Sequence, residues 1–146
     1  MEIKNFRHVG IVTENLSRSL NFYKKIFGLK VFKTQIETDP TLAKIMGLKR
    51  VEVKTVKLKN KKSVVLELLN WRYPKVKKDV AKKINSRGIT HFAVTVKNID
   101  TVLKKLKKFK NSTISKSELS ADKKVKYAFC KTPEKIFIEL VQVLHK

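Results

Sequence analysis

The 146-residue chain lacks the features that mark several classes of protein. Cys130 is its single cysteine, which excludes an intramolecular disulfide and a zinc site built from cysteines. No apolar run approaches the roughly 18 residues that a membrane-spanning helix needs. The first ten residues, MEIKNFRHVG, lack the apolar stretch of a signal peptide. We therefore expect a cytoplasmic protein without a membrane partner, and the 42% of hydrophobic residues predicts a packed core.

Acidic residues are also scarce. The chain has 12 Asp and Glu against 35 Lys and Arg, a formal net charge of +23. Such a balance attracts polyanions, but few of these cations are arginine, the residue best suited to bidentate contacts with phosphate and guanine. The lysines are spread over every segment of the chain. We therefore favour a solvated lysine surface over specific nucleic-acid binding, and keep attraction of small anionic substrates or weak nonspecific nucleic-acid contact as alternatives.

The sequence pattern occurs twice. HVGIVTENLS, which starts at His8, aligns without a gap with HFAVTVKNID, which starts at His91, and VLELL around Glu67 aligns with FIELV around Glu139. Alternation and turn residues predict strands at 6–13, 30–36, 51–59, 64–71, 89–96, 112–118, 124–131 and 135–143. Each half therefore has the order βαβββ, with module 1 at 5–72, a basic helix or linker at 73–88 and module 2 at 89–146 of a single domain.

The helices have recognisable ends. We expect one helix over 18–27, capped by Ser17, ended by Gly28 and buried along Leu16, Leu20, Tyr23 and Phe27. A second is expected over 98–109, capped by Asp100. Asp39-Pro40 opens a short helical or irregular piece that ends at Gly47. Residues 36–50 have no counterpart in the second half, and an insertion of this size is a candidate determinant of substrate specificity.

Histidine and glutamate are the polar residues that the two halves share in their strands. Glu67 and Glu139 stand among apolar residues, so we expect them to be buried and compensated by a cation, a metal ion or a shared proton. With His8 and His91 they make a set that suits a divalent metal such as Ni, Co, Zn, Mn or Fe. Water would fill the remaining positions of an open, catalytic type of site. Alternatively, each histidine is a core residue and each glutamate faces solvent, but the coincidence at repeat positions favours the metal.

The same residues carry a family resemblance. HVGIVTENLSRSLNFYKKIFGLKVF, VVLELLNW, ITHFAVTV and TPEKIFIELVQV resemble the vicinal oxygen chelate superfamily, which includes glyoxalase I, methylmalonyl-CoA epimerase, extradiol dioxygenases and antibiotic-resistance proteins. The resemblance implies an α+β fold in which two βαβββ modules form a mixed β-sheet cleft around a divalent metal. Its metal positions correspond to His8, Glu67, His91 and Glu139. Lys135 departs from the pattern, because a turn glycine is usual there, and this puts the turn conformation in doubt.

The ligand set narrows the chemistry that the resemblance implies. Glyoxalase I has two His and two Glu, the epimerase commonly has Gln at the position of Glu67, extradiol dioxygenases use two His and one Glu, and bleomycin-binding proteins lack the ligands. We therefore expect a metal-dependent lyase or isomerase that abstracts a proton alpha to a carbonyl, with Glu139 or Glu67 as the base. An Fe(II) extradiol-type dioxygenase and a non-catalytic binding or resistance protein are the alternatives.

The resemblance also suggests partners. Substrates of this class carry anionic tails of glutathione or coenzyme A, and a homodimer is common. Five basic residues are candidates to bind the tail: Lys33, Arg50, Lys54, Arg72 and Lys126.

Overall fold

The structure is a computed structural model that describes residues 7–61, 64–77, 83–85, 87–89, 91–109 and 115–144. The chain divides into two compact units, Met1–Lys78 and Asp79–Lys146, each with its own β-sheet. Among the described residues, no helix is long and apolar enough to cross a membrane.

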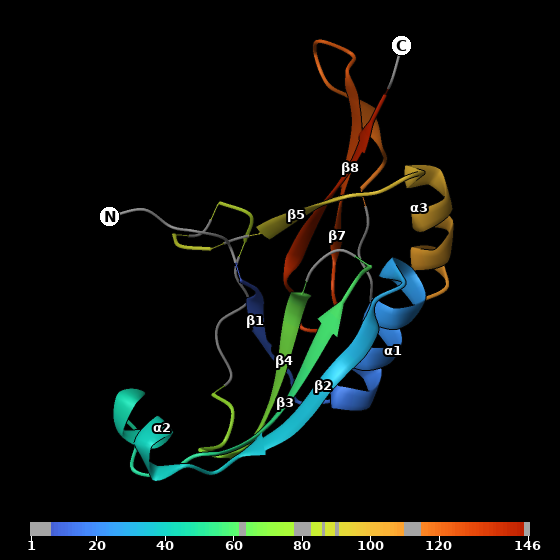
Figure 1. Cartoon of the computed structure of the whole chain (residues 1–146). Coiled ribbons are helices and arrows are strands. Elements are labelled where there is room, and N and C mark those ends of the chain that lie inside the picture. The colour runs from blue at the N-terminus through green and yellow to red at the C-terminus, as the bar shows by residue number, and fades with distance from the viewer. Residues whose placement is uncertain are drawn as a thin grey trace. The chain divides into compact units, whose positions relative to one another are not determined.

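Unit 1 folds in the order expected for a βαβββ module with one added helix (Figure 1). Its sheet has the order β1-β4-β3-β2, in which β1 runs parallel to β4 and the other pairs are antiparallel. The elements are β1 (Val9–Val12), α1 (Leu16–Phe27), β2 (Lys30–Glu37), α2 (Pro40–Ile45), β3 (Glu52–Lys59) and β4 (Val64–Tyr73).

Unit 2 repeats this topology in the order β5-β8-β7-β6, again with one parallel pair, β5 and β8. Its elements are β5 (His91–Thr95), α3 (Ile99–Lys107), β6 (Glu118–Leu119), β7 (Val125–Lys131) and β8 (Phe137–Val143). The expected α+β class, with two mixed four-stranded sheets, is confirmed.

The strand expected at 112–118 is mostly wrong. Residues 115–117 are not in a strand, β6 has only two residues, and 112–114 lie outside the described residues. Polar residues alternate with few apolar ones here, so the segment has too little apolar surface to stabilise a longer edge strand by burial. Of the basic helix or linker expected at 73–88, Tyr73 ends β4 and 75–77 have no regular structure, whereas 78–82 and 86 lie outside the described residues.

Asparagine, not the expected serine or aspartate, caps each of the two longer helices. The Asn15 side chain accepts a hydrogen bond from the Arg18 N–H at 2.9 Å, and the Asn98 side chain accepts one from the Thr101 N–H at 2.8 Å. The expected caps, Ser17 and Asp100, lie inside the first turn. Gly28 ends α1 as expected, in the left-handed region with a φ of 65°.

The buried stripe of α1 is rotated from the expected one. Ser19, Phe22, Tyr23 and Ile26 are buried, so Tyr23 is the one member that both stripes share. Ser19 tolerates burial because its hydroxyl shares a 2.6 Å hydrogen bond with that of Thr13. α1 contacts β4, and alternation places four of the most buried strand residues on one face of the sheet. These are Val56, Leu58, Leu66 and Leu68.

The opposite face of the first sheet carries Lys57 and Glu67 and is covered at one end by an apolar cluster. Ala43 of α2 is buried with Val51 and Val53 of the following segment. Partly buried side chains pack against these three: Leu42, Leu48, Leu69 and Trp71. The inserted segment therefore lies on the same face of the sheet as Glu67. Asp39 caps α2 and Gly47, at a φ of 66°, follows it, as expected.

Candidate metal centre

The first His–Glu pair is positioned by the parallel pairing of β1 and β4. Gly10 lies opposite Glu67 in this register, and His8 stands two residues before Gly10 on the same face. His8 Nε2 is 3.0 Å from Glu67 Oε2. The two side chains are 26% and 15% exposed, so the pair is half-buried and reachable from solvent.

The second pair repeats this geometry in unit 2. Ala93 lies opposite Glu139 in the parallel register of β5 and β8, and His91 stands two residues before Ala93. His91 Nε2 is 3.6 Å from Glu139 Oε2, with side chains 38% and 27% exposed. The His and Glu residues that align in the two halves thus occupy the same positions in the strand register of each unit. The expected burial of both glutamates is partial, because polar neighbours and solvent reach this face of each sheet.

Lys57 is the site residue that the sequence analysis missed. It lies directly opposite Glu67 in the antiparallel register of β3 and β4. Its Nζ is 3.4 Å from Glu67 Oε1, and its side chain is 21% exposed. One of the three expected compensations for Glu67, a cation, is therefore present. Strand alternation could place Lys57 on one face of β3, but only the pairing register shows that it meets Glu67.

Unit 2 has no equivalent of this lysine. Phe129 occupies the position opposite Glu139, and its ring makes an edge contact with His91, with 5.5 Å between the ring centroids. The two halves therefore share the His–Glu pair but differ in the residue beside it.

The donors of each pair fit a divalent cation. Two ligands bound at about 2.1 Å are about 3.0 Å apart at a right angle and about 3.4 Å apart at a tetrahedral angle. The separations of 3.0 Å and 3.6 Å lie near these values, and imidazole nitrogen with carboxylate oxygen suits Ni, Co, Zn, Mn or Fe. Within the described residues, no three His, Cys, Asp or Glu side chains gather in one place, so each unit supplies one pair. The convergence of the two pairs on one ion remains a prediction.

The five basic residues expected to meet an anionic tail lie in different settings. Arg50 and Arg72 each hold Glu52 at 3.0 Å, and Lys126 binds Asp100 at 2.9 Å.

The two remaining candidates lie on opposite faces of the first sheet. Lys33 lies opposite Lys57 across β2 and β3, so it shares the face of Glu67. Lys54 alternates to the other face of β3.

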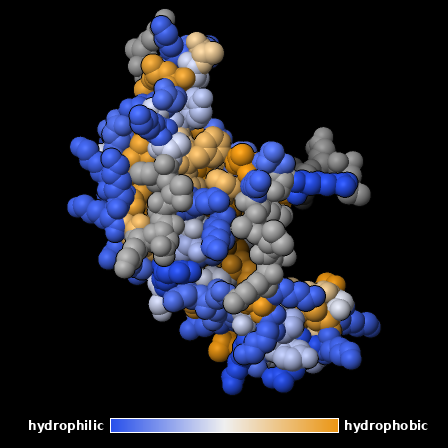
Figure 2. Space-filling view, turned by 180° about the vertical axis from the view of Figure 1, so that it is seen from behind, coloured by the Kyte–Doolittle hydropathy of each residue, from blue (hydrophilic) through white to orange (hydrophobic). Residues whose placement is uncertain are grey.

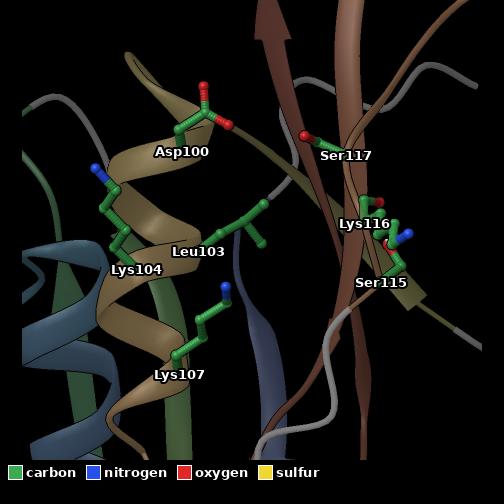
Figure 3. A pocket seen from close by; sticks show the side chains of 7 residues that line it. All are labelled: Asp100, Leu103, Lys104, Lys107, Ser115, Lys116 and Ser117. Atoms are coloured by element: carbon green, nitrogen blue, oxygen red, sulfur yellow. Dashed lines mark hydrogen bonds between the residues drawn. The ribbon is translucent and has the colours of Figure 1, made fainter.

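Lysines are also abundant away from the pairs. Figure 2 shows hydrophilic side chains over most of one face of the molecule, with hydrophobic patches between them. In unit 2 a hollow of about 440 Å³ lies between α3 and residues 115–117 (Figure 3). Leu103 and Lys107 extend from α3 toward that segment. None of the four predicted metal ligands lines this hollow.

Thr55 is a buried polar residue next to the first pair. It stands two residues before Lys57 on the same face of β3 and is 4% exposed. Its hydroxyl has no hydrogen-bond partner among the described residues, which is rare for a buried polar group.

The turn before β8 keeps its conformation without the usual glycine. Lys135 adopts a φ of 62°, in the left-handed region. The hydroxyl of the buried Thr132 accepts hydrogen bonds from the N–H groups of Glu134 and Ile136. The backbone carbonyl of Thr132 accepts one from the N–H group of Lys135. The doubt about this turn is resolved, because these bonds hold the left-handed lysine in place.

Several solved structures share this fold. A glyoxalase family protein from Bacillus cereus has a TM-score of 0.89 at 19% identity, covering 99% of this chain and 97% of its own. A trypanothione-dependent glyoxalase I from Leishmania major has a TM-score of 0.63 at 22% identity, covering 96% and 87%. The fosfomycin resistance protein FosX from Listeria monocytogenes has a TM-score of 0.64 at 11% identity, covering 98% and 96%.

Sequence comparison shows the family. No curated protein matches the chain. Residues 7–129, which include His8, Glu67 and His91, match the family described as the Glyoxalase/Bleomycin resistance protein/Dioxygenase superfamily. The chain therefore belongs to the Glyoxalase/Bleomycin resistance protein/Dioxygenase superfamily.

Proposed function

We propose that the protein is a divalent-metal-dependent lyase or isomerase that removes a proton alpha to a carbonyl, in the manner of glyoxalase I or methylmalonyl-CoA epimerase. One observation carries this proposal: a His–Glu pair stands at the same register position in both units. Two such pairs supply two imidazole nitrogens and two carboxylates to one ion, which would be Ni, Co, Zn, Mn or Fe. Retention of all four residues disfavours a dioxygenase, which uses fewer protein ligands.

A bound divalent ion would polarise the substrate carbonyl and stabilise the negative charge that develops on its oxygen. The proton needs a base within hydrogen-bond reach, and the two glutamates differ in this respect. Both oxygens of Glu67 are in contact, one with His8 and one with Lys57. Oε1 of Glu139 has no hydrogen bond or ion pair to a described residue, so we assign Glu139 as the base and Glu67 as the positioned carboxylate.

The proposed substrate is anionic, an adduct of glutathione or coenzyme A, which suits a chain of net charge +23. A homodimer is part of the proposal, in line with the superfamily. Two reactions test the chemistry: conversion of the hemithioacetal of methylglyoxal and glutathione, and epimerisation of methylmalonyl-CoA. A glyoxalase loses most of its activity in Glu67→Gln, whereas an epimerase tolerates this change. Unchanged activity in both Glu67→Gln and Glu139→Gln would refute the mechanism.

Lys57 favours a second candidate, a small-molecule binding or resistance protein without catalysis. A lysine that already neutralises Glu67 removes part of the need for a metal ion. Metal analysis of protein purified without chelators separates the two, because the second candidate retains no stoichiometric ion.

A further inference from the structure

We propose that Lys57 and Lys33 form an anion-binding subsite beside Glu67 that accepts a carboxylate or phosphate oxygen of the substrate, and that Lys57 is released to this subsite when a divalent cation takes Glu67. The inference rests on the proposed function and names the residues that would hold the anionic part of its substrate.

The register of the first sheet places the three charged residues in one row. Lys33 of β2 lies opposite Lys57 of β3, and Lys57 lies opposite Glu67 of β4. Directly opposed residues point to the same face of a sheet. Like charges in opposed positions destabilise a sheet unless an anion lies between or beside them. Glu67 is the one anion of this row, so the row carries two positive charges and one negative charge.

Lys57 and a metal ion compete for the same carboxylate. Glu67 presents Oε2 to His8 at 3.0 Å and Oε1 to Lys57 at 3.4 Å. The contact to Lys57 is the longer of the two. A divalent cation bound by His8 and Glu67 would repel the neighbouring ammonium group. Lys57 would then turn to another anion on the same face, beside Lys33.

Unit 2 shows that the lysines are not a requirement of the fold. The equivalent row there is Ser115, Phe129 and Glu139: the Ser115 hydroxyl accepts a hydrogen bond from the Phe129 N–H, and Phe129 lies opposite Glu139. The His–Glu pair is thus kept in both rows, while the two cations are specific to unit 1. An anionic substrate would therefore bind with its charged end toward the first sheet.

The other candidate cations have partners or lie elsewhere. Arg50 and Arg72 hold Glu52, and Lys126 holds Asp100. Lys33 forms no ion pair with a described residue. Of the five candidates for the anionic tail, this leaves Lys33 as the one on the face of the His–Glu pair, opposite Lys57.

Cobalt(II) titration of the full-length protein tests the competition, with Lys54→Met as the matched control, because Lys54 lies on the same strand but on its other face. Lys57→Met should bind Co(II) at least about tenfold more tightly than the wild type, since the competing and repelling charge is gone. Lys33→Met and Lys54→Met should bind it within about twofold of the wild type. Equal Co(II) affinity in Lys57→Met and the wild type overturns this inference alone. A wild type that binds no Co(II) overturns the proposed function as well.

Binding of oxalate to the cobalt-loaded proteins tests the subsite. Oxalate carries two adjacent anionic oxygens, and its affinity is measurable by calorimetry without turnover. Loss of a charge-assisted contact in Lys57→Met should weaken oxalate binding about tenfold or more, and Lys33→Met should weaken it severalfold. Lys54→Met should bind it as the wild type does. Wild-type oxalate affinity in both Lys33→Met and Lys57→Met would overturn the subsite.

Discussion

Two side chains contact the carboxylate of Glu67. His8 and Lys57 each contact one of its oxygens, at 3.0 Å and 3.4 Å. Glu139, in the same register position of unit 2, has His91 and the ring of Phe129 beside it. The two pairs therefore offer the same metal-ligand atoms, but the first has a lysine beside it and the second a phenylalanine.

Thr55 gives a prediction about the same face of the first sheet. Its buried hydroxyl has no partner among the described residues, so Thr55→Val should leave the free energy of unfolding unchanged or raise it by up to about 1 kcal/mol. Thr13 is a matched control, since it is equally buried but bonded to Ser19 at 2.6 Å, and Thr13→Val should lose about 1 to 2 kcal/mol. Urea unfolding measures both. A loss in Thr55→Val as large as that in Thr13→Val would show that the hydroxyl has a partner.

Lys135 predicts a stabilising substitution. A lysine at a φ of 62° is strained relative to glycine, so Lys135→Gly should raise the free energy of unfolding by about 0.5 to 1 kcal/mol. Lys123, at a φ of 57°, should respond in the same way, whereas Lys124, which is outside the left-handed region, should lose stability as glycine. Thermal unfolding measures all three. A lower melting temperature for Lys135→Gly would contradict the strain.

Burial of Cys130 should make the free energy of unfolding depend on pH. Burial raises the pKa of the Cys130 thiol from 9.0 to about 12. The unfolded chain ionises this thiol above pH 9 while the folded chain does not, so its contribution to stability is complete below pH 9 and is lost as the pH rises toward 12. The stability advantage of the wild type over Cys130→Ala should therefore shrink between pH 8 and pH 10.5, as measured by guanidinium unfolding. A constant difference over this range would contradict the buried thiol.

Among the elements, those with a strong local pattern were predictable. Strict alternation in VEVKTVKLK predicted β3, and the repeat of HVGIVTENLS predicted β1 and β5, which pair with the strands of Glu67 and Glu139. The helix starts were misassigned because two capping residues stand two positions apart, as Asn15 and Ser17 do, and the local sequence does not choose between them. The length of β6 was overestimated, because its segment has little apolar surface to bury.

The cap of α1 can be tested against the residue first expected to form it. Asn15→Ala removes the side chain that accepts from the Arg18 N–H and should cost about 1 kcal/mol of unfolding free energy. Ser17→Ala lies inside the helix and should change stability by less than about 0.5 kcal/mol. Chemical denaturation compares the two variants. A larger loss in Ser17→Ala than in Asn15→Ala would return the cap to Ser17.

For the whole molecule, duplication explains how much of the site could be predicted. The repeat predicted His8, Glu67, His91 and Glu139 as a set without any knowledge of strand pairing, and the structure pairs each histidine with the glutamate of its own unit, because equivalent positions of a duplicated module share a register. Lys57 breaks the repeat, since Phe129 replaces it in unit 2, so comparison of the halves could not reveal it. Its contact with Glu67 follows from β3–β4 pairing, which depends on contacts distant in sequence.

We propose that the His–Glu pairs of both units bind one ion, and this is tested by metal stoichiometry. Cobalt(II) binding should be measured for the wild type, His8→Ala and His91→Ala under the same conditions. We expect one ion per chain in the wild type and a loss of affinity of about tenfold or more in each variant, because both histidines would be ligands of the same ion. Absence of a bound ion, or a variant that keeps full affinity for it, would show that the two pairs do not share an ion.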